Sequence, residues 1–565
     1  MKKLLLLFVL AGYALNASSQ NNWEWARGAS ASDTEDQEGF AVTTDIFGNV
    51  YMTGFFSNTT MGFGSFSLSN AYPGQGDVYI AKYDLNGNFL WARSAGGPAE
   101  EIGEGLGTDA AGNVYLTGYF HSPSITFGSY TLSNAGSDNI YLVKYDPSGN
   151  VVWAKSAGGT SSDNATGLAV AETSVGTRIY IAGLLQSASS QFGGISVIPL
   201  GGGSAFIAQY DDLGNPLWVR TGGAATGTAM ALGVTADSLG RATITGFFSA
   251  SPSVFDSYSL NTSGGRDIFV ASYDISGNIR WAKSAGGINA DLGNSAATDA
   301  CGNIYVTGYV STPSATFDTL TVTSHSNAED IFIAKYDTAG AFQWVRTAGK
   351  LGFNNSYSVA TDISGNAYIG GVYADSMIFE TDTLFYPPGG IDPVFIAKYD
   401  SHGTLLYLTS LASGGDDIFG IATDKSCNVY LSSDYIPSSF TIGDDTLHRT
   451  GGECSFVAKM SSSCFSKPSC RPCETALTFP NVFSPNSDGI NDNFIPLEHT
   501  GASNTLLKIY NRWGEELFRS DDLSKGWNGT HNNKNCPDGT YFWILEYQDC
   551  NHESGRSRGF LSLVR

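Results

Sequence analysis

The residues best suited to metal chemistry lie near the C-terminus, where oxygen-bearing side chains alternate around a glycine. They are Asn486, Asp488, Asn491 and Asp492. Hard cations such as Ca²⁺ take several carboxylate and amide oxygens at short spacing, so this segment is the candidate calcium site. Because a complete calcium-binding loop with its closing Glu is absent, a turn held by hydrogen bonds alone is the alternative.

Further carboxylates recur along the chain in the element D-x-x-G-N. One set of copies occupies residues 45–49, 109–113, 299–303 and 362–366, and a second set occupies residues 84–88, 146–150, 211–215 and 274–278. Asp side chains commonly satisfy backbone donors in hairpin turns, so we predict structural turns here. Catalysis and weak cation binding by these acidic turns are the alternatives.

The histidines do not form the patterns of the common metal-dependent hydrolases. The seven His residues show neither H-x-H nor H-E-x-x-H spacing. We therefore predict a non-enzymatic protein with no catalytic residues and no cofactor, calcium aside. A pair of carboxylates acting as acid and base is the catalytic arrangement that this pattern leaves open.

The acidic turns belong to a repeat marked by W-[AV]-[KR]. Its Trp recurs at intervals of 62 to 66 residues, and Tyr replaces it in the last copy. The positions are Trp25, Trp91, Trp153, Trp218, Trp281, Trp344 and Tyr407. A unit copied this often relies on its neighbours to bury apolar surface, so we predict that the Trp rings pack between units rather than stack on sugars.

Each repeat of about 63 residues predicts a four-stranded antiparallel sheet. The D-x-x-G-N turns join strand one to two and strand three to four, so both lie at the same end of the sheet. A long loop joins strands two and three at the other end, as at residues 57–76 and 311–329. Loops of this length commonly carry recognition, and we predict the binding surface there.

The two ends of the repeat region complement each other. The last copy stops after residues 456–460 without its own fourth strand, whereas the chain begins with an unattached one at residues 23–27. We predict that this N-terminal strand completes the last sheet. The fold would then be an all-β, seven-bladed β-propeller over residues 20–461 with no open sheet edge.

The repeats resemble those of secreted bacterial β-propeller proteins known as SBBP repeats. The shared motifs are D-x-x-G-N-x-Y-x-T-G and W-A-x-x-x-G-G, which cover residues 20–461. The resemblance implies a propeller. It implies no single activity, because propellers support binding, scaffolding and hydrolysis alike.

A Cys/Ser/Pro linker at residues 462–475 separates the repeats from a different C-terminal region, residues 476–565. Five candidate strands at residues 477–482, 505–510, 516–519, 540–547 and 559–564 predict a small Ig-like β-sandwich. The region resembles the gliding-motility-associated, type B C-terminal sorting domain of the Bacteroidetes type IX secretion system. The resemblance rests on F-P-N-V-F-S-P-N-S-D-G-I-N-D-N-F (479–494), K-I-Y-N-R-W-G-E-E-L-F (508–518), G-W-N-G-T (526–530), P-D-G-T-Y-F-W-I-L-E-Y (537–547) and G-F-L-S-L-V-R (559–565). It implies the secretion machinery as a partner.

The N-terminus and the charge agree with an exported protein. Residues 1–19 combine a Lys pair, an apolar run and small residues, which predicts a cleavable signal peptide, and no later apolar run is long enough to span a membrane. The net charge of −23 argues against nucleic-acid binding. We expect a secreted or outer-membrane cell-surface location.

The eight cysteines cluster towards the C-terminus, which predicts that the repeats do not depend on disulfides. Cys470 and Cys473 lie in the linker, where a structural disulfide is expected in an exported protein. The pairings themselves do not follow from the sequence.

The sequence therefore favours a binding module, adhesin-like, whose ligand is a glycan or another surface protein. Two alternatives stand beside it. One is an extracellular hydrolase of polysaccharide with an acid and a base in the central cavity. The other is a structural component of the cell surface or of the motility apparatus.

Overall fold

The computed structural model describes residues 23–311, 313–324, 329–380, 382–387, 393–411, 414–462, 476–486, 491–496, 498–500, 503–548 and 554–565. No helix occurs among these residues. The chain divides into two compact units, Met1–Pro468 and Ser469–Arg565. The all-β architecture predicted from the repeat pattern is thus confirmed.

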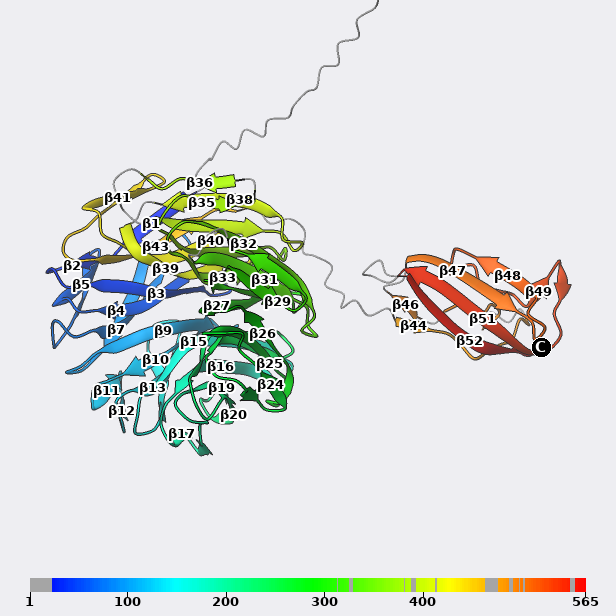
Figure 1. The fold of residues 1–565 in the computed structure, drawn as a ribbon, viewed down its shortest axis with the longest axis horizontal. Helices are drawn as coiled ribbons and strands as arrows, with labels where there is room; N and C mark the ends of the chain where they lie inside the picture. Colours follow the sequence, from blue (N-terminus) through cyan, green and yellow to red (C-terminus); the bar gives the residue numbers. More distant parts are fainter. Residues whose placement is uncertain are drawn as a thin grey trace, which may run out of the picture. The chain divides into compact units, whose positions relative to one another are not determined.

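The first unit contains, among the described residues, seven antiparallel sheets that each have a core of four strands, and in four of these sheets a hairpin adds two further strands. Figure 1 shows their arrangement. Their first strands are β3 (Gln37–Thr44), β9 (Glu101–Thr108), β15 (Asp163–Thr173), β21 (Ala229–Ala236), β27 (Asp291–Thr298), β33 (Asn354–Thr361) and β39 (Gly414–Thr423). The second strands are β4 (Val50–Phe56), β10 (Val114–Phe120), β16 (Gly176–Leu185), β22 (Ala242–Phe248), β28 (Ile304–Val310), β34 (Ala367–Tyr373) and β40 (Val429–Tyr435).

The third and fourth strands complete each sheet. The third strands are β7 (Asp77–Tyr83), β13 (Asn139–Tyr145), β19 (Ser204–Asp211), β25 (Asp267–Tyr273), β31 (Asp330–Tyr336), β37 (Val394–Tyr399) and β43 (Cys454–Met460). The fourth strands are β8 (Phe89–Ala95), β14 (Val151–Gly158), β20 (Pro216–Gly223), β26 (Ile279–Gly286), β32 (Phe342–Lys350), β38 (Leu405–Leu411) and, in the last sheet, β1 (Trp23–Gly28).

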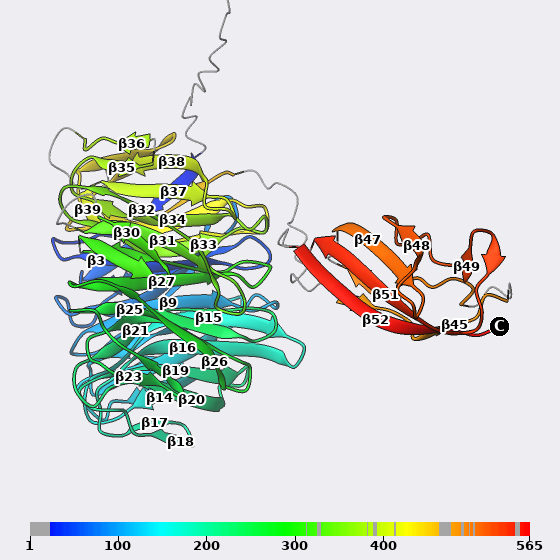
Figure 2. The same ribbon diagram turned by 45° about the vertical axis from the view of Figure 1, so that its right-hand side comes forward.

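The sheets follow one another around an axis in the manner of a β-propeller. Each first strand lies beside the first strand of the next sheet, and β39 lies beside β3 (Figures 1 and 2). The N-terminal strand β1 pairs with β43, with Trp25 opposite Lys459 and Gly28 opposite Phe456. β1 is thus the outer strand of the sheet of order β1-β43-β40-β39.

The long segments between second and third strands differ from the prediction, because each folds back as a two-stranded hairpin. The hairpins are β5 (Thr60–Phe63) with β6 (Phe66–Ser69), β11 (Ser124–Phe127) with β12 (Tyr130–Ser133), β17 (Ser190–Phe192) with β18 (Ile195–Val197), β23 (Ser253–Phe255) with β24 (Tyr258–Leu260), β29 (Ser314–Phe317) with β30 (Leu320–Thr323), β35 (Met377–Phe379) with β36 (Asp382–Leu384) and β41 (Ser439–Ile442) with β42 (Asp445–His448). Several extend the outer strand of the preceding sheet, as β17 does on β14, and β5 pairs with β2 (Ser30–Ala31). They cover sheet edges at the outer rim.

The recurring Trp residues pack against the following sheet, as predicted. Trp91 Nε1 donates to Pro147 O at 3.1 Å, in the turn between the last two strands of the following sheet. Its ring lies so close to Gly149 that an added Cβ would come within 2.8 Å. Arg93 Nε donates to Gly149 O at 2.9 Å, with its guanidinium 5.5 Å from the Trp91 ring. The Trp–Gly contact repeats as Trp25–Gly87, Trp153–Gly214, Trp218–Gly277, Trp281–Gly340 and Trp344–Gly403.

The cysteines correct one expectation. Cys301 and Cys427 lie in D-x-x-G-N-type turns of two different repeats, and both are disulfide-bonded. Disulfides are therefore not confined to the C-terminal region. Among the described residues, Cys454 and Cys536 are buried free thiols. Cys470 and Cys473 lie outside the described residues.

The second unit is built on a five-stranded sheet of order β45-β52-β51-β47-β48. Its strands are β45 (Val482–Phe483), β47 (Ser503–Tyr510), β48 (Glu516–Ser520), β51 (Gly539–Gln548) and β52 (Ser554–Leu563), joined by β44 (Ala476–Thr478) with β46 (Glu498–Thr500) and by β49 (Thr530–His531) with β50 (Lys534–Asn535). Phe483, Phe494, Trp527 and Trp543 belong to the core on one face of the sheet. The run expected as one strand at residues 477–482 is divided between β44 and β45.

The Trp–Gly contact predicts unequal effects of one substitution at two equivalent turns. Gly149 and Gly48 have φ values of 81° and 84°, so Ala strains both backbones by about 1 kcal/mol. Only Gly149→Ala also forces a methyl group into Trp91, for a further cost of about 2 kcal/mol. Urea unfolding should give the lower midpoint for Gly149→Ala. Equal midpoints for the two variants would show that the Trp91 contact does not constrain the turn.

Candidate functional site

The acidic turns hold their carboxylates in complete hydrogen-bond sets. Asp45 Oδ1 accepts the backbone N–H groups of Phe47 and Asn49, both at 2.9 Å. Asp45 Oδ2 accepts Asn49 Nδ2 at 2.7 Å and the Tyr51 hydroxyl at 3.1 Å. The same four bonds recur at Asp109, Asp299, Asp362 and Asp424. These residues are the structural turn formers that the sequence predicts.

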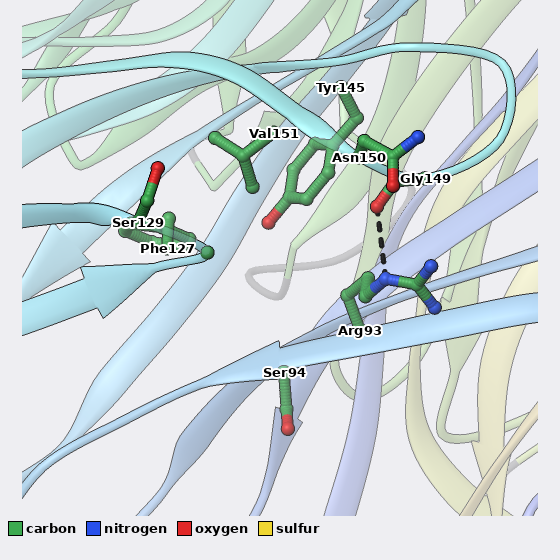
Figure 3. Close-up of a pocket in the computed structure, with 9 residues that line it drawn as sticks. Arg93, Ser94, Phe127, Ser129, Tyr145, Gly149, Asn150 and Val151 are labelled. Atoms are coloured by element: carbon green, nitrogen blue, oxygen red, sulfur yellow. Dashed lines mark hydrogen bonds between the residues drawn. The ribbon is translucent and has the colours of Figure 1, made fainter.

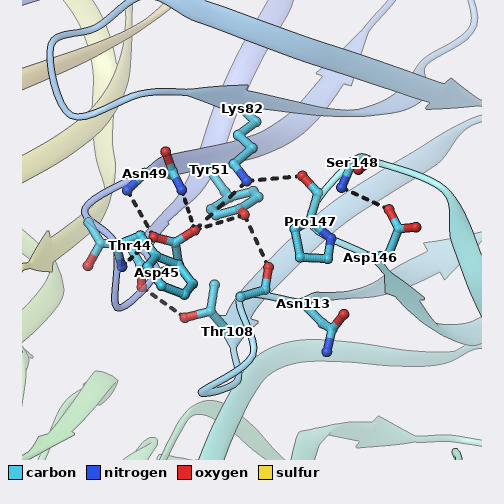
Figure 4. A network of polar contacts seen from close by, with 12 residues as sticks. Thr44, Asp45, Asn49, Tyr51, Lys82, Thr108, Asn113, Asp146, Pro147 and Ser148 are labelled. Carbon is cyan, nitrogen blue, oxygen red and sulfur yellow. Dashed lines mark hydrogen bonds and ion pairs between the residues drawn. The ribbon is translucent and has the colours of Figure 1, made fainter.

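A buried lysine extends this network to the next sheet (Figure 4). Lys82 Nζ lies 3.9 Å from Asp45 Oδ2 and 4.9 Å from the Tyr51 ring centroid, and it donates to Pro147 O at 3.0 Å. Burial lowers the pKa of Lys82, and the charge of Asp45 opposes that shift. The carboxylate oxygens of these Asp turns already accept hydrogen bonds. The Asp-turn end of the propeller is therefore poorly suited to bind a cation.

The structure describes three of the four residues of the candidate calcium site. Asp488 lies outside the described residues, whereas Asn486, Asn491 and Asp492 lie within them. Ser484 N donates to Asn491 O at 3.0 Å, and Asn491 has a φ of 55°. Among the described residues, no group of three or more His, Cys, Asp or Glu side chains could hold a metal ion. The calcium assignment stays a prediction.

Pairs of buried carboxyl groups, which the sequence analysis missed, occur at the opposite end of the sheets. Asp267 begins a third strand and Asp291 begins the first strand of the following sheet. Asp267 Oδ1 and Asp291 Oδ2 come within 3.0 and 2.9 Å of the place a Cβ on Gly286 would take. The glycine of the W-A-x-x-x-G-G motif therefore makes room for both acids.

The two acids of this pair have different surroundings. Asp291 accepts the N–H groups of Gly287 and Ser311 at 2.7 and 2.9 Å. In the described structure, Asp267 Oδ1 has no hydrogen-bond partner. Burial raises the pKa of Asp291 to about 7, with a further contribution from Asp267, and burial raises the pKa of Asp267 to about 6. The pair therefore holds a proton near neutral pH.

Other junctions contain the same arrangement with different side chains. Asp77 and Glu101 take the corresponding places between the first two sheets, and burial followed by the charge of Glu101 raises the pKa of Asp77 to about 7. At the next junction the pair is Asn139 and Asp163, which converge on Gly158. An uncharged amide thus already stands where Asp267 stands in the later sheet. The spacing A-G-G-x-x-x-[DE] was the sequence signal for these acids.

The axis of the first unit contains a cavity of about 350 Å³ at the Asp-turn end. Threonines near the ends of the first strands line it, including Thr43, Thr108, Thr235, Thr298, Thr361 and Thr423. Hydroxyl groups here bond to the neighbouring sheet, as Thr108 Oγ1 does to Thr44 O at 2.8 Å and Thr44 Oγ1 to Thr423 O at 3.0 Å. The residues that line this cavity are uncharged, and hydroxyl groups beside it are bonded to the neighbouring sheet.

The part of the first strands nearer the long loops carries carboxylates instead. Glu38 and Glu104 are half-buried residues of the neighbouring first strands β3 and β9. Burial raises the pKa of Glu104 to about 7, and the charge of Glu38 contributes. Burial raises the pKa of Tyr119, and the negative charge of Glu104 raises it further. An acid with a pKa near neutral thus lies next to a second carboxylate.

Aromatic side chains accompany these carboxylates. Phe55, Tyr119, Phe247 and Tyr309 occupy the same position in the second strands of four sheets. Phe40 of β3 lies 5.8 Å from Phe55, ring centre to ring centre. We name the loop-side mouth as the set Glu38, Phe40, Phe55, Glu104 and Tyr119. Polar and aromatic groups of this kind are typical of binding sites.

A separate pocket of about 230 Å³ lies at the rim between the first two sheets (Figure 3). Arg93, Phe127, Gly149 and Val151 line it. Phe89 holds the position of Val151 in the first sheet, where its ring stacks on that of Phe63 at 5.4 Å. The pocket is therefore the gap left by a smaller side chain.

Comparison with known families assigns the second unit. Residues 477–563 match the CHU_C Type IX secretion signal domain. The C-terminal region is a type IX secretion signal domain. Proteins that carry this domain are exported to the cell surface or the extracellular space, and the secretion machinery is its partner. In the part of the chain that the structure describes, no helix is long and apolar enough to cross a membrane.

Other known proteins are more distantly similar to the chain. An uncharacterized WD repeat-containing protein of Acanthamoeba polyphaga mimivirus is 30% identical over 126 residues, which cover 20% of this chain and 9% of that protein. The regulatory protein FlaEY of Caulobacter vibrioides is 28% identical over 175 residues, covering 30% of this chain and 18% of that protein. This chain thus spans less than a fifth of either relative.

Solved structures give weak similarity of the same kind. The Neurospora crassa Pan2 WD40 domain has a TM-score of 0.37 at 10% identity, covering 75% of this chain and 90% of that one. A protein of unknown function from Dyadobacter fermentans has a TM-score of 0.34 at 9% identity, covering 78% of this chain and 99% of that one.

The Asp267–Asp291 pair predicts a stability that falls as the pH rises. Both pKa values are raised on folding, so the folded state binds more protons between about pH 4 and pH 7, and unfolding becomes easier across that window. Asp267→Asn removes the proton requirement and should gain about 2 kcal/mol at pH 8 with little change at pH 4.

The matched control is Asp291→Asn. This change removes one of the carboxylate oxygens that accept the N–H groups of Gly287 and Ser311, so it should lower the free energy of unfolding at every pH. Urea midpoints of the propeller transition from pH 4 to pH 8 measure both effects. An unchanged pH slope in Asp267→Asn would refute the shared proton.

The rim pocket predicts a stabilising substitution. Val151→Phe restores the ring found at Phe89 and should raise the free energy of unfolding by about 1 kcal/mol through added apolar burial against Phe127. Val151→Ala enlarges the gap and should lower it. The urea midpoints of the two variants should lie on opposite sides of the wild-type value; a lower midpoint for Val151→Phe would mean that the pocket cannot accept a ring.

Proposed function

We propose that this chain is a secreted or cell-surface binding module, adhesin-like, in which a seven-bladed β-propeller of SBBP type presents the binding surface. Residues 1–19 act as a cleaved signal peptide, and residues 476–565 form an Ig-like, type B sorting domain for the type IX system. The observation that carries the proposal is the match of residues 477–563 to a type IX secretion signal domain.

The ligand we propose is a glycan or another surface protein, bound at the loop-side mouth. Three properties support this choice of site. Glu104 has a pKa raised by burial, aromatic rings lie beside it, and the opposite end of the channel has its hydroxyls bonded to neighbouring sheets. Aromatic faces combined with carboxylate acceptors suit ligands that present both C–H faces and hydroxyl groups.

An extracellular polysaccharide hydrolase is the second candidate. The specific observation in its favour is Glu104, which has a pKa of about 7 and the charge of Glu38 nearby. Glu104 would be the acid and Glu38 the base or nucleophile, since environments that separate two carboxyl pKa values suit those two roles. A structural part in the cell surface or in motility is a third candidate, without an observation of its own.

Binding to an array of glycans and cell-surface extracts tests the first proposal. Tyr119→Ala should lower affinity by about tenfold, because it removes a ring from the loop-side mouth. Leu239→Ala is the control, since Leu239 is exposed in the Asp237–Arg241 turn at the other end of the sheets. Loss of binding in the control alone would move the site to the Asp-turn end.

The same array, assayed for cleavage products, separates binding from hydrolysis. Glu104→Gln preserves the side-chain volume but cannot donate an acidic proton. A hydrolase would lose activity by about 100-fold in this variant while retaining affinity. Wild-type protein that binds saturably and releases no product would exclude the hydrolase.

A further inference from the structure

Among the described residues of the signal domain, no second layer covers one face of the five-stranded sheet. Leu507, Leu545 and Leu561 point to the core on the other face. On the uncovered face, Tyr510 lies opposite Phe542, and Phe542 lies opposite Phe560. Three aromatic side chains therefore lie side by side across β47, β51 and β52, which are adjacent in Figures 1 and 2. Phe542 is 47% exposed and Phe560 62% exposed.

Positive charge lies next to this aromatic row. Arg556 and Arg558 are exposed on β52, the latter opposite Ile544. Glu546 pairs with Lys508 at 2.8 Å and lies opposite Arg556, and Glu516 pairs with Arg519. The described residues of this face thus carry four cations, Lys508, Arg519, Arg556 and Arg558, against two carboxylates, so positive charge is in excess. The whole chain has a net charge of −23, which makes a cationic patch unusual in it.

The aromatic row ends at a hollow of about 460 Å³. Trp513, 82% exposed, and Arg512 form one wall, and Phe542 lies at the junction with the row. The Arg512 guanidinium lies 5.5 Å from the Trp513 ring centroid. We name Tyr510, Trp513, Phe542 and Phe560, with Arg512, Arg556 and Arg558, the aromatic face.

We propose that the aromatic face is the surface by which the type IX secretion machinery recognises this domain, and that the receptor presents an acidic surface with an apolar recess. This inference rests on the proposed export route. Exposed aromatic residues beside arginine have the composition of interface hot spots. A contiguous exposed apolar patch of this kind marks an interaction site.

The charge of the aromatic face indicates whether its partner is the receptor or a second copy of this chain. In a two-fold symmetric dimer through the aromatic face, the Arg556 and Arg558 patch of one copy would meet the same patch on the other. Like charges brought together at an interface are unfavourable, whereas an acidic receptor complements them. The receptor is therefore the occupant that fits.

The test follows export of the full chain in a bacterium with a type IX system. Phe542→Thr/Phe560→Thr keeps residues that favour strands and removes two rings. It should reduce the protein in the medium and at the surface by about tenfold, with protease-resistant protein held in the periplasm. Ile495→Thr, exposed in the same domain but outside the aromatic face, is the control and should be exported normally.

Arg556→Glu/Arg558→Glu tests the charge without changing the aromatic residues, so it decides the matter if the threonine variant fails to fold. It should be retained in the same way. Normal export of both variants would overturn the inference, as would a wild-type dimer in analytical ultracentrifugation that Phe542→Thr/Phe560→Thr abolishes. Wild-type export that continues unchanged in a strain lacking the type IX translocon would instead refute the proposed export route.

Discussion

The contact between one Trp and the turn of the following sheet is the interaction on which the first unit depends. A four-stranded sheet of this size leaves both faces apolar, and only neighbouring sheets can cover them. Trp91 meets the backbone of Gly149, and Arg93 fixes the same turn through its carbonyl. Because the contact recurs from sheet to sheet, the position of each sheet is set by the one before it. The Asp–Tyr–Lys network performs the same task nearer the axis.

Much of this architecture could be predicted because its determinants are local and repeated. The D-x-x-G-N turns, the Trp spacing and the missing fourth strand each leave a direct trace in the sequence. The outer hairpins were missed because their strands, such as β17 (Ser190–Phe192), are too short to show a period. The carboxyl pairs were missed for another reason: Asp77 and Glu101 belong to different repeats, and only the junction between sheets brings them together.

The two ends of the propeller differ in what they leave available. At the Asp-turn end, carboxylates, hydroxyls and amides are bonded to one another or to the adjacent sheet. At the loop end, the half-buried Glu104 and the buried Asp267 have raised pKa values, and Asp267 Oδ1 has no donor in the described structure. Polar groups left incompletely bonded in this way are where functional chemistry concentrates. Regular repetition thus stabilises one end and leaves the other free to vary.

The pairing of β1 with β43 sets the order of events during folding. Trp23 and Met460 are partners although more than four hundred residues separate them. In a chain that is synthesised from its N-terminus, β1 therefore remains unpaired until β43 has been synthesised. Such a long-range contact forms slowly, and during the delay the strand is an open edge available to other chains. A chain that ends before β43 therefore leaves the edge of β1 without a partner strand, and a chain that includes β43 covers it.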